Sequence, residues 1–428
     1  MSKIDAMIQE LCPNGVELTR LGNICKRVVS GGTPKAGIVE YYGGNIPWLR
    51  TQEVDWNDIY DVSIKITEEG LKNSSAKWIP KNCVIVAMYG ATAGKVAINK
   101  IELTTNQACC NLEINPSKAL YRYVYHWLCK SYLKLKSLGQ GTQSNLNAQM
   151  IKDFPIPLPP LEIQREIVRV LDAFTELTTE LTTELTRRKR QYEYYRDKLL
   201  SFDPGVAPLC PLKEISDILT GYPFDSSQFS RTGIRLLRGM NVKRGELNFS
   251  EENNRYWSSD EGFDAYHLEE DDVIIAMDGS LVGKSYGYVK KEHLPALLVQ
   301  RVARIRANGV NPRFLYHCVS NNFTDYVERK KTGGAVPHIT KKDIEEFQIP
   351  LPSLRTQERL VRVLDNFDAI CQDLEIGLPA EISARKKQYE YYRDQLLNFA
   401  QFGAINSLTH SLTHSLTHSL THSLNDKR

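Results

Sequence analysis

The chain of 428 residues contains 54 Lys and Arg against 51 Asp and Glu, so its formal net charge is only +3. This balance neither supports nor excludes nucleic acid as a partner, because the clustering of basic side chains decides that. No run approaches the roughly 18 apolar residues of a membrane span, no signal-peptide pattern opens the chain, and the nine Cys include no CxxC pair, so we expect a cytoplasmic protein with reduced thiols and no metal site.

The first 158 residues are predicted to form a globular unit of mixed helices and strands. Ile4, Ile8 and Leu11 recur at helical spacing and predict a short N-terminal helix,. Residues 46–50 follow two glycine turns and have a strand pattern,. Residues 82–95 (NCVIVAMYGATAGK) combine the apolar run of a buried strand with a glycine-rich turn,.

Residues 159–203 are predicted to form one long amphipathic helix. Neither Gly nor Pro interrupts residues 161–202, and apolar side chains recur three or four residues apart,. Within this helix the sequence Thr-Glu-Leu-Thr occurs three times in succession, at residues 175–186. We interpret the repeat as a spacer between two globular units; the alternative is a solvated helix with a leucine stripe.

A second globular unit, residues 204–352, repeats the plan of the first. Residues 271–284 (DDVIIAMDGSLVGK) parallel residues 82–95, and Gln300 aligns with Gln107. The aligned scaffolds carry loops that differ widely, as expected of two modules that perform the same kind of recognition on different targets.

The C-terminal part of the chain repeats the sequence of the long helix. Residues 388–399 match residues 191–202 at ten of twelve positions, and a Pro-rich lead precedes both helices. The chain is therefore a tandem duplication of a domain followed by a helix. The second helix is predicted to be broken at residues 377–379 (Gly-Leu-Pro) and to restart at Ala380,.

The motifs that would indicate catalysis are missing from the sequence. Residues 90–95 and 279–285 resemble phosphate-binding loops, but three residues separate their glycines where a nucleotide-binding loop has four,. His126 and His317 lie in segments that are rich in aromatic residues and are predicted to be helical, and we expect both to pack in the core. Serine-nucleophile, zinc-hydrolase and dinucleotide-binding motifs do not occur,. We therefore expect a protein that binds rather than an enzyme.

The duplicated modules, the Pro-rich leads IPLPPL and IPLPSL, the QYEYYRD segments and the Thr-Glu-Leu-Thr repeat together resemble the DNA specificity subunits of type I restriction-modification systems. The resemblance covers roughly residues 13–399. It implies an α+β fold in which two pseudo-repeated, mixed α/β target recognition domains are separated by two long antiparallel helices that form a coiled-coil-like spacer. Each domain would read one half of a bipartite site in double-stranded DNA.

The same resemblance implies the partners. The helices would dock two methyltransferase (modification) subunits, and restriction (endonuclease and translocase) subunits would join them. AdoMet, ATP and Mg would be used by those partners, while this non-catalytic chain would bind no cofactor itself.

The expected organisation has five parts. They are a first target recognition domain at residues 1–158, a central spacer helix at 159–203, a second target recognition domain at 204–352, a distal helix at 353–400, and a low-complexity Ser-Leu-Thr-His tail at 401–428, which we expect to be disordered,.

Candidate DNA contacts are polar or basic residues of loops, since such side chains read base edges or bind phosphates. They are Arg50, Thr51, Gln52, Lys95, Gln143, Ser144 and Asn145 in the first module, and Arg238, Asn241, Lys243, Arg244, Lys284, Lys330, Lys331 and His338 in the second. A solvated loop position is the alternative for each. Candidate spacer and docking residues are Leu171, Phe174, Leu177, Leu181, Leu185, Tyr192, Tyr195, Leu364, Phe367, Tyr389 and Tyr392.

The competing hypothesis is a stand-alone two-headed DNA-binding or adaptor protein. Such a protein should hold DNA tightly by itself. A specificity subunit should need its methyltransferase partners, because its long helices expose apolar stripes.

Overall fold

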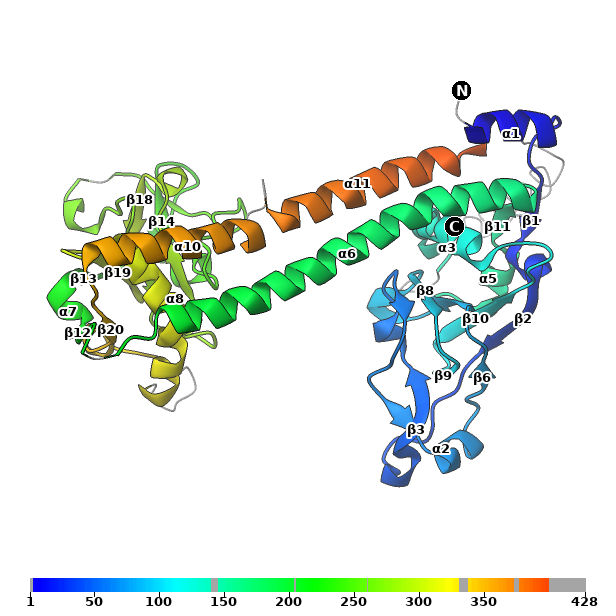
Figure 1. The fold of residues 1–428 in the computed structure, drawn as a ribbon, viewed down its shortest axis with the longest axis horizontal. Helices are drawn as coiled ribbons and strands as arrows, with labels where there is room; N and C mark the ends of the chain where they lie inside the picture. The colour runs from blue at the N-terminus through cyan, green and yellow to red at the C-terminus, as the bar shows by residue number, and fades with distance from the viewer. Residues whose placement is uncertain are drawn as a thin grey trace, which may run out of the picture. The chain divides into compact units, whose positions relative to one another are not determined.

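The computed structural model of the chain describes residues 3–139, 145–203, 205–259, 261–330, 338–372 and 377–399. It divides into two compact units, unit 1 (Met1–Glu180 with Ile382–Arg428) and unit 2 (Leu181–Glu381). Helix α6 (Leu161–Leu199) begins in unit 1 and ends in unit 2 (Figure 1). Among the described residues, no helix combines the length and the apolar character needed to cross a membrane.

Unit 1 is built on two sheets whose inner strands are apolar runs. Strands β7 (Val84–Ala87) and β8 (Val96–Asn99) are buried at every position, as expected of strands that are covered on both faces. The sheet orders are β2 (Cys25–Ser30), β10 (Cys109–Ile114), β7, β8 and β4 (Asp58–Ile59) in the first sheet, β5 (Lys65–Ile66), β3 (Tyr42–Leu49), β9 (Leu103–Thr105) and β6 (Trp78–Ile79) in the second, and β1 (Leu18–Arg20) with β11 (Pro155–Pro157) in a separate pair.

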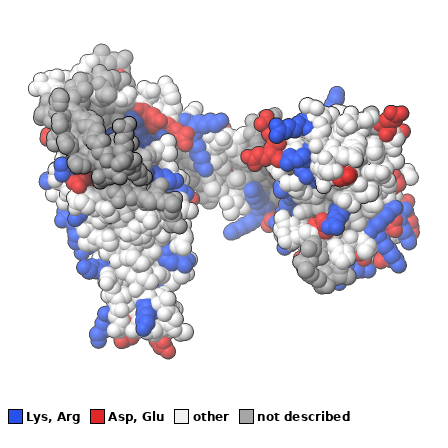
Figure 2. Space-filling view, turned by 180° about the vertical axis from the view of Figure 1, so that it is seen from behind, with Lys and Arg blue, Asp and Glu red and all other residues white. Residues whose placement is uncertain are grey.

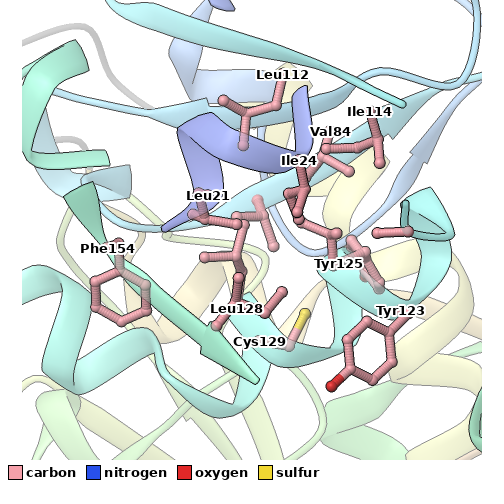
Figure 3. Close-up of a cluster of buried hydrophobic side chains, with 14 of the residues drawn as sticks. Leu21, Ile24, Val84, Leu112, Ile114, Tyr123, Tyr125, Leu128, Cys129 and Phe154 are labelled. Carbon is pink, nitrogen blue, oxygen red and sulfur yellow. The ribbon is translucent and has the colours of Figure 1, made fainter. Parts of the chain in front are cut away.

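The core of unit 1 lies between the first sheet and its helices. Helix α3 (Tyr121–Lys130) contributes Tyr123 and Leu128, which pack with Val84 and Leu112 of the sheet (Figure 3). The predicted N-terminal helix is present as α1 (Lys3–Leu11). The other short helices of this unit are α2 (Glu68–Lys72), α4 (Tyr132–Lys136) and α5 (Ala148–Asp153).

Unit 2 repeats the central part of this topology, with one strand fewer in each of the two main sheets. The sheet order β13 (Ser216–Thr220), β19 (Val302–Ala307), β16 (Val273–Ala276) and β17 (Tyr286–Tyr288) corresponds to β2, β10, β7 and β8. The parallel pair β14 (Ile234–Leu237) and β18 (Ala296–Leu298) corresponds to β3 and β9. The remaining elements are β12 (Leu209–Pro211), β15 (Tyr256–Trp257), β20 (Gln348–Pro350), α7 (Leu212–Ile215), α8 (Pro312–Lys330), α9 (Lys341–Glu345) and α10 (Leu354–Gln372).

Each unit pairs one helix from each copy of the duplication. In unit 1, Phe174 of α6 stacks on Tyr392 of α11 (Leu378–Leu396), with ring centroids 5.2 Å apart. In unit 2, Tyr195 of α6 stacks on Phe367 of α10 at 6.0 Å. These are equivalent positions of the two copies with their roles exchanged. The predicted break is present at Gly377, which forms a bend, but α11 begins at Leu378, two residues before the expected restart, while residues 373–376 lie outside the described residues.

The Thr-Glu-Leu-Thr repeats lie within the unbroken helix α6. The hydroxyl groups of Thr178, Thr179 and Thr186 donate to carbonyl oxygens four residues earlier, at 2.8, 2.8 and 2.9 Å, so the helix satisfies these side chains itself. The predicted α+β fold class, with two α/β domains and long helices that pack together, is confirmed.

Candidate nucleic-acid interface

Five segments of unit 1 meet where its strands end. We call residues 31–33, 50–52, 88–92, 106–107 and 145–146 the edge loops of unit 1. Backbone hydrogen bonds tie them to one another and to the strands: Asn106 N donates to Leu49 O (2.9 Å), Gly32 N to Thr105 O (2.9 Å), Met88 N to Ala108 O (2.8 Å) and Leu146 N to Met88 O (2.9 Å).

The same frame recurs in unit 2, bond for bond. Its edge loops are residues 221–222, 238–240, 277–280, 300–301 and 338–339. Val299 N donates to Leu237 O (3.1 Å), Tyr222 N to Leu298 O (3.0 Å), Met277 N to Arg301 O (2.9 Å) and Ile339 N to Met277 O (2.9 Å). This correspondence makes Arg50 equivalent to Arg238, Tyr89 to Asp278, Gln107 to Gln300, Ala108 to Arg301 and Asn145 to His338.

Glycine is required at two places in each frame. A Cβ atom on Gly31 would lie 1.9 Å from Thr105 O, and one on Gly221 would lie 2.2 Å from Val299 O. Gly90 and Gly279 adopt positive φ angles of 77° and 99°, which side chains disfavour. The phosphate-loop-like motifs are therefore explained by a tight turn after a buried strand.

Arg50 and Arg238 have the same setting in the two units. Each precedes a short 3-10 turn, and its backbone N–H donates to a side chain three residues on, Glu53 Oε1 at 3.4 Å or Asn241 Oδ1 at 3.1 Å. Both Nε atoms are buried without a hydrogen-bond partner in the described part of the chain. Burial and the nearby Arg255 lower the pKa of Arg238.

The structure places the sequence-predicted contact residues in three groups. Within the edge loops lie Arg50, Thr51, Gln52, Asn145, Arg238 and His338. Outside the described residues lie Gln143, Ser144 and Lys331. Elsewhere in the two units lie Lys95, Asn241, Lys243, Arg244, Lys284 and Lys330.

Several members of the last group have structural partners. The Asn241 side chain is fully buried and donates to Asn248 O at 2.9 Å. Lys95 contacts Asp55 at 2.6 Å and lies over the Trp56 ring. Lys330 lies 3.3 Å from Glu346. Lys243, Arg244 and Lys284 are exposed, and the Arg244 side chain is hydrogen-bonded to Tyr286.

The exposed edge-loop residues that were not among the predicted contacts include Tyr89, Gln107, Gln300 and Arg301. The alignment of Gln107 with Gln300 was the available signal. These residues lie together because the loops converge at one end of the sheets. That convergence depends on pairing between strands that are distant in sequence.

Most of the predicted spacer residues lie in the seams, which are the contacts that α6, α10 and α11 make with one another or with the core of their own unit. Leu171, Tyr192 and Leu364 are buried, whereas Tyr195 and Tyr392 remain 39% and 43% exposed. Leu177, Leu181 and Leu185 are half-buried along α6. Phe174, Phe367 and Tyr389 make the ring contacts of the seams.

A polar cluster attaches α3 in the α/β domain of unit 1 to α6 and α11. His126 is fully buried and its Nε2 lies 2.8 Å from Asp172 Oδ1, while Nδ1 lies 2.9 Å from the Tyr389 hydroxyl. Arg122 donates to the same Asp172 oxygen from Nη2 at 2.6 Å. A neutral imidazole that donates to the carboxylate and accepts from the phenol satisfies every partner. The expectation that His126 packs in the core is correct for its burial but misses this hydrogen-bonding role.

Unit 2 has an equivalent cluster with one difference. Arg313 and His317 contact Asp365 Oδ1 at 2.5 and 2.8 Å, but Nδ1 of His317 is buried without a hydrogen-bond partner among the described residues. Ligand-type atoms of His317, Asp365 and Asp368 lie within 4.8 Å of one another, a spacing that could hold a metal ion. Because Arg313 already pairs with Asp365 and lies 3.6 Å from Asp368, a guanidinium supplies the cation here.

The cluster of unit 1 predicts a pH effect on stability. Burial lowers the pKa of His126, so below about pH 6.5 the unfolded chain takes up a proton that the folded chain does not. We expect the melting temperature of unit 1 to fall between pH 7.5 and 5.5, and His126→Gln to remove that part of the pH dependence. Calorimetry of the full chain at both pH values measures this; an equal slope in the variant would contradict it.

Charge alone does not locate an interface. On the face that Figure 2 shows, Lys and Arg are interspersed with Asp and Glu over both units, consistent with the net charge of +3. The edge loops are the better candidate, because a rigid frame presents polar side chains there in both units.

Comparison with known proteins points the same way. The family described as "Type I restriction modification DNA specificity domain" matches residues 13–188 and 211–384. The chain is 32% identical to the type I restriction enzyme EcoR124I/EcoR124II specificity subunit of Escherichia coli, over 66% of this chain and 72% of that protein. It is 26% identical to the putative type I restriction enzyme specificity subunit S.HindORF215P of Haemophilus influenzae, over 90% and 94%.

Two solved structures share the fold. The S subunit of a type I restriction-modification system from M. genitalium aligns with a TM-score of 0.56 at 17% identity, over 90% of this chain and 97% of that chain. A chain from a structural study of complex assembly and conformational transition in the type I R-M system aligns with a TM-score of 0.57 at 20% identity, over 90% and 98%.

Proposed function

The chain belongs to the family of type I restriction-modification DNA specificity subunits, which are not catalytic, and we propose that each of its units reads one half of a bipartite DNA site through its edge loops. One observation carries this proposal: the same backbone frame occurs twice, with different side chains at several of its positions, among them Tyr89 against Asp278 and Asn145 against His338. A repeated frame with altered side chains is what reading two different half-sites requires.

The chemistry of the loops suits base edges. Gln107 and Gln300 are exposed at equivalent positions, and a glutamine amide can make paired hydrogen bonds with adenine. Gln52 and Asn145 add amides in unit 1, and His338 is exposed in unit 2. The basic candidates Lys95, Lys243, Arg244, Lys284 and Lys330 suit phosphates better, because they lie outside the loop frames.

The helices are proposed to set the gap between half-sites and to dock two methyltransferase subunits. The matching segments at residues 191–202 and 388–399 each expose a tyrosine, Tyr194 at 61% and Tyr391 at 62%. Exposed aromatic side chains favour protein interfaces, and two copies of one surface suit two copies of one partner. We also propose that the domains and helices are bounded at residues 158, 203, 352 and 400.

The wider complex is inferred from the family. Restriction subunits would complete it in the cytoplasm, and AdoMet, ATP and Mg would be bound by the partner subunits and not by this chain. Methylation would thus follow the specificity of the edge loops.

Co-expression with a methyltransferase subunit of the same system tests the proposal. We expect a co-purifying complex and, by genome-wide methylation sequencing, methylated adenines in a two-part motif with a fixed gap. A chain that leaves no methylation mark but binds DNA tightly alone would instead support the stand-alone binder.

A further inference from the structure

Arg301 is an exposed arginine in an unusual backbone position. Its φ angle is +65°, in the left-handed region that residues with a Cβ rarely adopt. The side chain is 71% exposed. Arg301 lies in the edge loops of unit 2, where its carbonyl oxygen accepts from Met277 N at 2.9 Å and the preceding Gln300 N donates to Tyr222 O at 2.8 Å. The backbone is therefore held on both sides.

Asp278 orients the Arg301 guanidinium. Arg301 Nη1 donates to Asp278 Oδ2 at 2.8 Å, and the Asp278 side chain is only 24% exposed. Asp278 also forms a backbone bridge with His338 of the same edge loops. The carboxylate holds one guanidinium nitrogen in place, so the remaining N–H groups of the planar guanidinium keep a fixed direction. Paired hydrogen bonds to two acceptors in one plane need donors that are oriented in this way.

Stability does not explain this arrangement. An exposed ion pair contributes little in water, and the left-handed backbone of a residue other than Gly costs more than such a pair returns. A glycine at position 301 would remove that strain. Strained residues that the surrounding structure holds in place cluster at functional sites, so a role in recognition is the remaining explanation.

The pair is confined to unit 2. The equivalent positions in unit 1 hold Ala108 and Tyr89, and Ala108 is buried. The two frames therefore differ at a position where unit 2 presents an oriented guanidinium and unit 1 presents none. This difference would separate the two half-sites.

We propose that Arg301, oriented by Asp278, reads a guanine in the half-site of unit 2 through O6 and N7 of the base edge. This inference rests on the proposed function of the edge loops. Arginine paired with those two acceptors is the commonest specific contact in the major groove, and Ala108 at the equivalent position of unit 1 has no side-chain donor with which to make it. Asp278 is a positioning residue that acts through Arg301.

The test uses the full chain in complex with its methyltransferase subunit. We compare the wild type with Arg301→Gly, whose backbone suits the left-handed region, and with Arg231→Gly, an exposed arginine of unit 2 outside the edge loops. We expect Arg301→Gly to melt no lower than the wild type, to methylate the wild-type site about 5- to 150-fold more slowly, and to accept other bases at one guanine of one half-site only.

The outcomes separate this inference from the function on which it rests. If the wild-type complex gives no bipartite methylation, the proposed function fails. If the wild type does but Arg301→Gly keeps its motif and rate, the inference alone fails. A uniform loss over all sequences would indicate a phosphate contact and would also overturn it. Arg231→Gly should retain the wild-type motif and rate, and Asp278→Asn should weaken selection at the same guanine.

Discussion

Asp172→Ala should strongly destabilise unit 1. The change leaves His126 buried without the carboxylate 2.8 Å from its Nε2, and removes the closest partner of Arg122. Breaking a buried ion pair costs about 3–5 kcal/mol, and we expect about 3 kcal/mol because Arg122 keeps Asp58 at 3.0 Å. For a domain of about 150–250 residues this lowers the melting temperature by about 6–12 °C.

Glu184→Ala is the matched control for that measurement. Glu184 also binds two arginines, Arg187 and Arg188, at 2.8 and 2.6 Å, but it does so at the surface, where ion pairs contribute little. Thermal unfolding of the full chain should show a large fall for Asp172→Ala and almost none for Glu184→Ala. Equal melting temperatures for the two variants would mean that the buried cluster does not hold unit 1 together.

A fourth Thr-Glu-Leu-Thr unit should lengthen the unread gap between the half-sites by about one base pair. Four residues add about 6 Å and about 40° to a helix, and one base pair of B-DNA rises about 3.4 Å and turns about 34°. The rotation nearly matches that of one base pair. The added turn needs no new partners, because threonines of the repeat donate to carbonyl oxygens of α6 itself.

Methylation mapping of the four-repeat variant measures this directly. Both half-sites should stay unchanged, since the repeats lie apart from the edge loops. As a control, replacing the threonines of the three repeats by alanine keeps the length of α6 and should keep the gap. An altered half-site, or an unaltered gap in the four-repeat variant, would refute the spacer role.

The fold was predictable because the two copies within the chain can be aligned with each other. The buried strands and helix boundaries appear where the two copies of the domain and helix agree in sequence. The break near residue 377 appears where the two copies differ. Burial of His126 and His317 followed from their apolar surroundings. Their partners Asp172 and Asp365 did not, because these lie 46 and 48 residues away and meet them only through packing.

The candidate site was less predictable, for a similar reason. Loop composition suggested Asn241, yet its amide closes the loop on itself by accepting from Arg238 N and donating to Asn248 O. Arg301 looked like any arginine after a strand, since its backbone conformation and its pairing with Asp278 arise only when β16 and β19 align. Side chains whose roles depend on such distant pairings carry no local signal.

The reciprocal ring contacts between the helices of the two copies also bear on how such a chain arises. Phe174 of the first copy stacks on Tyr392 of the second, and Phe367 of the second stacks on Tyr195 of the first. A half-length ancestor with one domain and one helix would carry both surfaces of this reciprocal contact, so two molecules could pair as a twofold-symmetric homodimer. That dimer would be limited to palindromic sites, and tandem gene fusion would release the two halves to diverge and recognise asymmetric ones.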